Sequence, residues 1–71
     1  MKNGLEKLRK DSKLSQFQLA RQLNITPQSI HNWEVGKSKP NAEAIYKMAQ
    51  ILGTSTDNIF LALNTTKVVK N

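Results

Sequence analysis

The sequence predicts an all-α domain built from five short helices. Helix-starting and helix-ending residues recur at short intervals, and the apolar residues between them follow the i, i+3, i+4 spacing of one helix face. No segment shows the period-2 alternation of a strand long enough to form a sheet core. With 71 residues the chain has room for one compact domain. We therefore expect a domain over residues 1–64 and a tail over 65–71, which would be either a frayed end or a short strand.

The first two helices are expected at about residues 3–11 and 16–23. Ser15 is a strong N-cap, and Gln18 three residues later completes a capping box. The second helix therefore begins directly after Ser15.

The third helix has the clearest start signal in the chain. Thr26 can cap it, and Pro27 suits the first helical position, where a missing N–H group does no harm. Gly36 is a natural residue to follow its end. The gap between the second and third helices is then the tight turn 24–26.

The fourth and fifth helices complete the prediction. Asn41 is the expected cap of the fourth helix, and Gly53 closes it. Ser55 is expected to cap a short fifth helix, with Ile59 and Phe60 as its buried face.

The composition favours a polyanion as the partner. Eleven Lys and Arg against five Asp and Glu give a net charge of +6 and a pI near 10.0, which is typical of nucleic-acid binders. Plain solubility is the alternative reading of the charge. The absence of cysteine excludes disulfides and thiolate metal sites. A charged N-terminus without a signal-peptide apolar region, and no membrane-length apolar run, predict a cytoplasmic protein with no membrane partner.

Two short helices joined by a three-residue turn, with a basic loop after them, predict a helix-turn-helix. Projection of the third helix with Ile30 facing inward places Trp33 and Glu34 on the packed side. Gln28 and Asn32 then face outward. Amide side chains can pair with the major-groove edge of adenine, so both are candidate base contacts. An ordinary polar helix face is the alternative.

Ser29 and His31 flank this outward face. Ser29 is a candidate for a base or phosphate contact, and His31 is either a DNA contact or a solvated residue. His31 is the only histidine and has no Cys or carboxylate at ligand spacing, so we expect no metal site. We also expect no cofactor and no enzymatic activity, because the sequence has no nucleophile–base constellation and no Gly-rich phosphate loop.

A longer pattern runs through about residues 5–60. It consists of Leu5, Leu8, Arg9, Leu14, Ser15, Gln16, Leu19, Ala20, Leu23, Ile25, Thr26, Ile30, Trp33, Glu34, Gly36, Pro40, Ile45, Ala49, Leu52, Gly53, Asp57 and Ile59. This pattern resembles the Cro/cI-like helix-turn-helix regulators, also called the XRE family. The resemblance implies a five-helix lambda-repressor-like fold that binds a double-stranded DNA operator.

The resemblance also implies phosphate contacts. Gln16 matches a residue that grips a phosphate and braces the start of the recognition helix, at a helix end that favours anions in any case. An exposed residue without a role is its alternative. Lys37, Ser38 and Lys39 match the loop along the DNA backbone, and we group Thr26 with them. Such contacts set register and affinity but carry no base information.

Other matched positions are structural or depart from the family. Arg9 and Glu34 match an ion pair that ties the first helix to the third, in agreement with a carboxylate on the packed side that would be unfavourable unpaired. Trp33 is expected in the core.

Two positions depart from the family pattern. Pro27 stands where a polar base reader is common, so only an apolar contact with a thymine methyl is expected there. Phe17 stands at a usually polar position, either exposed or partly buried against the first helix.

The expected function is that of a phage or prophage regulator of the lysis/lysogeny switch, similar to small Cro-like proteins or modulators of repression. A 71-residue chain without an appended ligand-sensing domain is typical of them. It would act by occupying an operator, as a homodimer on a palindrome, with residues 61–69 as the dimer surface. The alternative is an antirepressor or antitoxin-like module that binds a partner such as a repressor. Candidate residues for protein contact are Phe17, Leu61, Leu63 and Val68.

Overall fold

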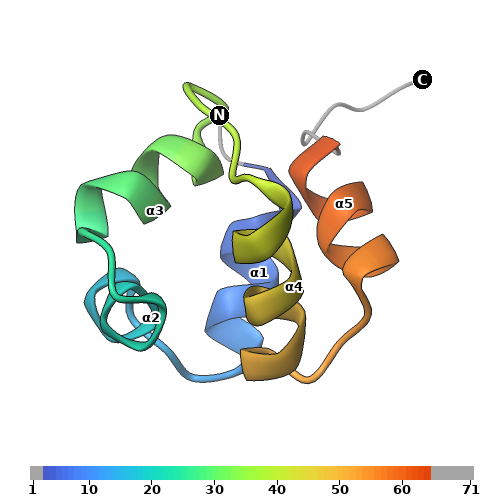
Figure 1. Cartoon of the computed structure of the whole chain (residues 1–71), viewed down its shortest axis with the longest axis horizontal. Coiled ribbons are helices and arrows are strands. Elements are labelled where there is room, and N and C mark those ends of the chain that lie inside the picture. Colours follow the sequence, from blue (N-terminus) through green and yellow to red (C-terminus); the bar gives the residue numbers. More distant parts are fainter. Residues whose placement is uncertain (1–2, 65–71) are drawn as a thin grey trace.

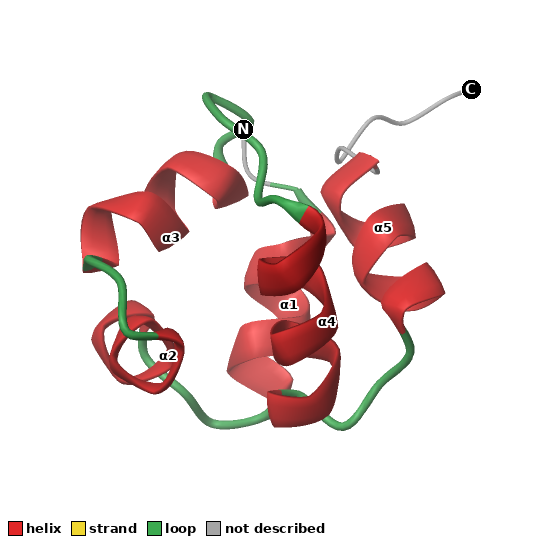
Figure 2. Ribbon diagram, viewed as in Figure 1, coloured by secondary structure: helices red, strands yellow, loops and turns green. Residues whose placement is uncertain are grey.

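The structure of this protein is a computed structural model that describes residues 3–64. This part of the chain folds into five helices and has no strand (Figure 2). The helices are α1 (Gly4–Asp11), α2 (Gln16–Leu23), α3 (Pro27–Glu34), α4 (Ala42–Ile51) and α5 (Thr56–Asn64). The all-α prediction is therefore confirmed. The expectations for the tail lie outside the described residues.

The helices begin where local capping chemistry predicts. The Ser15 hydroxyl accepts a hydrogen bond from the Gln18 N–H at 3.0 Å, and the Gln18 Oε1 accepts one from the Ser15 N–H at 2.8 Å. This reciprocal pair is the predicted capping box. Side chains at three further helix starts accept a backbone N–H three residues ahead: Thr26, Asn41 and Ser55.

Two glycines follow helix ends as predicted. Gly36 follows α3 and its cap residue with φ +81°, and Gly53 follows α4 with φ +66°. Positive φ is unfavourable for residues with a Cβ, which explains glycine at both ends.

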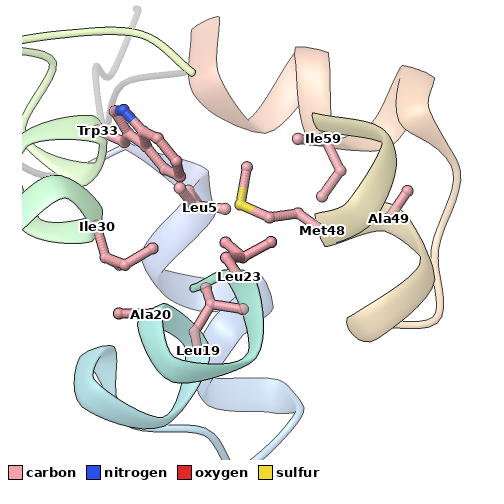
Figure 3. Close-up of a cluster of buried hydrophobic side chains, with 9 residues drawn as sticks. All are labelled: Leu5, Leu19, Ala20, Leu23, Ile30, Trp33, Met48, Ala49 and Ile59. Carbon is pink, nitrogen blue, oxygen red and sulfur yellow. The ribbon is translucent and has the colours of Figure 1, made fainter. Parts of the chain in front are cut away.

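The core lies where the helices converge (Figure 3). α1 and α4 occupy the centre of the molecule, with α2 and α3 on one side and α5 on the other (Figure 1). Every helix contributes to the core, whose buried apolar members are Leu5, Leu19, Ala20, Leu23, Ile30, Trp33, Met48, Ala49 and Ile59. The predicted core position of Trp33 is confirmed. α2 and α3 are thereby held as one unit against α1 and α4.

The predicted burial of Phe60 is wrong. Ile59 is fully buried, but Phe60 is 59% exposed. Neighbouring residues on a helix point about 100° apart, and α5 packs only one side against α1 and α4. The second apolar contact of this face comes one turn later from Leu63, which is half-buried against the core.

The first helix begins one residue later than expected, because Asn3 caps it. The Asn3 Oδ1 accepts the Leu5 N–H at 3.0 Å. Its Nδ2 donates to the carbonyls of Trp33 at 2.8 Å and Leu63 at 3.4 Å, and its backbone N–H donates to the Glu34 carbonyl at 2.8 Å. One buried amide thus joins the start of α1 to the ends of α3 and α5.

Candidate nucleic-acid interface

The connection between α2 and α3 is a tight turn. Asn24 caps α2 with φ +61° and ψ +43°, and its N–H bonds to the Arg21 carbonyl at 3.1 Å. The Ile25 N–H then bonds to the Ala20 carbonyl at 2.9 Å, while the Ile25 side chain packs against the core. This turn carries the chain directly into α3, so the start of α3 has no long loop in front of it.

The faces of α3 are divided as the projection predicts. Ile30, Trp33 and Glu34 are buried. Gln28 is exposed and Asn32 partly exposed, and the Gln28 Nε2 donates a hydrogen bond to the Asn32 Oδ1 at 3.0 Å. Both amides thus lie on the side of α3 away from the core. Their contact with bases stays a prediction.

Of the remaining candidates on α3, Pro27 and Ser29 lie at its start and His31 lies in its last turn. The Thr26 and Ser29 hydroxyl oxygens are 3.1 Å apart and form a hydrogen bond. Pro27, Ser29 and His31 are partly exposed. The hydroxyl pair fixes Ser29 beside the cap, at the positive end of the α3 dipole. DNA contact by any of these residues is an expectation.

The loop after α3 is exposed and anchored to it. Its three predicted phosphate contacts, Lys37, Ser38 and Lys39, are all exposed. The Asn32 carbonyl accepts the Lys37 N–H at 2.8 Å and the Ser38 N–H at 3.4 Å. The loop backbone is thus fastened to the same residue that carries one of the outward amides.

Free positive charge gathers around the helix-turn-helix. On α1 and α4 the exposed cations form i, i+4 ion pairs: Lys7–Asp11 at 3.2 Å, Lys10–Glu6 at 3.1 Å and Lys47–Glu43 at 3.2 Å. Within residues 3–64 the cations without an ion pair are Lys13, Arg21, Lys37 and Lys39. Three of these four lie in α2 or in the loop after α3. Arg21 was not among the predicted site residues, although it is the only cation of α2.

The predicted ion pair between α1 and α3 is confirmed. The Arg9 Nε lies 2.6 Å from the Glu34 Oε2, and both side chains are buried. The Arg9 Nη2 bonds to the Glu34 Oε1 at 3.3 Å, and the Arg9 Nη1 bonds to the Leu14 carbonyl at 2.8 Å. Arg9 is therefore used inside the fold rather than at the surface.

The predicted bracing role of Gln16 needs a correction. Its Nε2 donates to the Glu34 Oε1 at 3.0 Å, so it braces the end of α3 and not the start. The reason is that Glu34 is buried within reach of Gln16 at the N-terminus of α2, and its Oε1 accepts from Gln16 as well as from the Arg9 Nη2. Gln16 is partly exposed and keeps a second N–H group. A phosphate contact by that group stays a prediction.

The candidate protein-contact residues lie on different helices. Phe17 on α2 is 61% exposed and Leu61 on α5 is 63% exposed. The structure therefore places Phe17 at the surface rather than against α1. Leu63 is half-buried against the core, which leaves little of it for a partner. Val68 lies outside the described residues.

Neither a metal site nor a membrane segment is found in residues 3–64. No three His, Cys, Asp or Glu side chains there come together as potential metal ligands. None of the described helices has the length and apolar character needed to cross a bilayer. The expectations that the protein uses no cofactor and is not an enzyme stay predictions.

Known proteins are similar to this chain over the same region, the helix-turn-helix and the helices around it. A family model described as helix-turn-helix matches residues 5–59. The SPbeta prophage-derived uncharacterized HTH-type transcriptional regulator YonR of Bacillus subtilis is 40% identical over 53 residues, 75% of this chain and 49% of that protein. Multiprotein-bridging factor 1a of Arabidopsis thaliana is 40% identical over 53 residues, 75% of this chain and 37% of that protein. This chain thus spans less than half the length of these two relatives.

A third relative is similar in length. The uncharacterized HTH-type transcriptional regulator MJ0272 of Methanocaldococcus jannaschii is 34% identical over 61 residues, 86% of this chain and 92% of that protein. No solved structure gives a significant match. The family match covers the core, the turn and α3 together. The chain therefore belongs to the XRE-type helix-turn-helix family, a family of DNA-binding transcriptional regulators.

Proposed function

We propose that this protein reads a specific operator by placing α3 in the major groove of DNA. The observation that carries the proposal is the position of Gln28 and Asn32 on the side of α3 opposite the core. A major groove about 12 Å wide admits one helix, and amide side chains can pair with base edges there. The tight turn before α3 lets its first residues approach the bases.

The residues around α3 divide into two groups in this proposal. The base-facing group is Gln28, Asn32, Ser29, His31 and Pro27, the last through apolar contact only. The phosphate-facing group is Gln16, Thr26, Lys37, Ser38 and Lys39. Support for the second group comes from its exposed lysines, which have no ion pair within residues 3–64, and from the α2 and α3 N-termini, which attract anions.

The proposed biological role is control of a phage or prophage switch by operator occupancy. A bound copy would block polymerase or a competing repressor sterically. One module of this size has a modest contact area, so we expect two copies on a palindrome, about one helical turn apart. The prophage-derived name of one relative supports this setting.

A second candidate function is binding to a partner protein, as an antirepressor or antitoxin-like module. It is favoured by the exposed side chains of Phe17 and Leu61, and by a relative named as a multiprotein-bridging factor. In this case α3 would not need to discriminate between DNA sequences.

The test is selection of duplexes from a randomised library by the full chain, followed by anisotropy titrations at fixed salt. Gln28→Ala should lose about 5- to 150-fold discrimination at one base pair, because bidentate amide pairing is lost there. The matched control, Gln50→Ala, removes an exposed amide from α4 and should change nothing. If no sequence is enriched, and a repressor from the same replicon is still captured, the partner-binding function replaces the proposal.

A further inference from the structure

The two outward amides of α3 are joined to each other. The Gln28 Nε2 lies 3.0 Å from the Asn32 Oδ1, one helical turn away. Within residues 3–64 neither side chain has another hydrogen bond. The geometry therefore sets both amides in one relative orientation before DNA is bound, and leaves the rest of each amide available.

The direction of this hydrogen bond decides what each amide can still offer. A primary amide has two N–H donors and one oxygen with two lone pairs. Gln28 uses one N–H group, so it retains its second N–H and its Oε1, the two groups that pair with adenine N7 and N6. Asn32 uses one lone pair of its oxygen and keeps both N–H groups.

Asn32 is thereby biased toward the role of a donor. Its Oδ1 faces Gln28, so its free edge presents N–H groups. In the major groove, guanine through O6 and N7 and thymine through O4 present acceptors without a hydrogen-bond donor, whereas adenine presents its N7 acceptor beside the N6 donor. Cytosine presents a donor, its N4 amino group, and offers Asn32 no matching acceptor there.

We infer that Gln28 and Asn32 read two neighbouring base pairs as one coupled unit. Gln28 pairs with adenine, and Asn32 donates to guanine or thymine at the neighbouring position of the same strand. The inference rests on the proposed insertion of α3 into the major groove. Its consequence is that Gln28 controls the preference at a base pair that it does not touch, because without Gln28 the Asn32 amide can turn over and present its oxygen instead.

Duplex selection from a randomised library tests this with the full chain and its variants. The wild type should enrich adenine at one position and guanine or thymine at the neighbouring position, and the enriched base identifies which acceptor is used. Gln28→Ala should weaken the preference at both positions. A double-mutant cycle combines Gln28→Ala with Asn32→Ala. The fold loss of affinity in the double variant should differ by at least about threefold from the product of the fold losses in the two single variants.

Asn32→Asp separates the donor role from the link to Gln28. The carboxylate still accepts the Gln28 N–H but has no N–H of its own, so the second position should change from an acceptor base to cytosine. Gln50→Glu is the matched control, because it adds the same charge on α4. It should lower affinity for all sequences a little and leave the preference unchanged.

The outcomes separate this inference from the proposed function. Single losses that multiply, or a Gln28→Ala variant with an unchanged preference at the second position, overturn the coupling while sequence-specific binding stands. Enrichment of cytosine by the wild type at that position, on the strand that carries the adenine read by Gln28, overturns the proposed contact of Asn32 as a donor to that strand. A wild type that enriches no sequence overturns both the proposed function and this inference.

Discussion

Glu34 connects the end of α3 to both α1 and α2. Its carboxylate is fully buried, and it accepts hydrogen bonds from the Arg9 Nε, the Arg9 Nη2 and the Gln16 Nε2. Every buried side-chain polar atom of residues 3–64 has a hydrogen-bond partner. A satisfied buried ion pair adds little net stability, but removal of one partner leaves an uncompensated charge. Glu34 therefore fixes where the end of α3 meets α1 and α2.

At the residue scale we predict that Arg9→Ala lowers the free energy of unfolding by about 3–5 kcal/mol, because Glu34 stays buried without its cation. Urea denaturation followed by the fluorescence of Trp33, the only tryptophan, measures this. The control is Lys7→Ala, which breaks the exposed ion pair with Asp11. It should change the free energy of unfolding by less than about 1 kcal/mol.

Arg9→Ala could leave too little folded protein to measure, since small domains have only about 5–15 kcal/mol of stability. Replacement of both Arg9 and Glu34 by Met should then recover a large part of the loss, because no charge is left buried. A double variant that is no more stable than Arg9→Ala would contradict this account.

At the scale of elements, the angle between α2 and α3 depends on the turn that joins them. Asn24 adopts the left-handed conformation with φ +61°, and its exposed side chain has no described partner. Asn and Gly tolerate this conformation better than other residues. The angle at which α3 leaves α2 is therefore set by the backbone at Asn24, together with the packing of Ile25 against the core.

We predict that Asn24→Ala lowers the free energy of unfolding by about 1–2 kcal/mol, because alanine tolerates the left-handed conformation less well than asparagine does. Asn24→Gly should leave stability within about 1 kcal/mol of the wild type. Urea midpoints of the two variants give the comparison. Equal midpoints for Ala and Gly would show that the turn relaxes to another conformation.

At the scale of the whole molecule, charge is distributed unevenly. The lysines of α1 and α4 are locally neutralised by carboxylates one turn away, whereas Arg21, Lys37 and Lys39 have no ion pair within residues 3–64. Residues 3–64 carry eight Lys and Arg against five Asp and Glu, which is +3 of the chain's net charge of +6, and the three cations just named lie in α2 and in the loop after α3. This is the arrangement that phosphate binding requires.

We predict that Lys37→Ala and Lys39→Ala each weaken DNA binding on all sequences and reduce the slope of log K against log salt by about 1. Each substitution removes one phosphate contact and the counterion released there. Anisotropy titrations over a potassium chloride series measure the slope. Lys7→Ala is the matched control, and a slope change as large as that of Lys39→Ala would contradict the proposed phosphate loop.

The helices and the outward face of α3 could be predicted from the order of the residues alone. Caps such as Ser15, Thr26 and Asn41 act within four residues, and so do Pro27 and Gly36, so their effects are readable in one dimension. The projection of α3 rests on the fixed geometry of one helix and needs no knowledge of its neighbours.

The hydrogen-bond partner of each polar side chain, in contrast, became known only from the packing of the helices against one another. The sequence did not predict that Asn3 ties three helices together, that Gln16 braces the end of α3, or that Gln28 donates to Asn32. The exposure of Phe60 likewise depended on where α5 packs. These details follow from the distances between atoms of different elements, or from the choice between side-chain orientations, and residue spacing along the chain fixes neither.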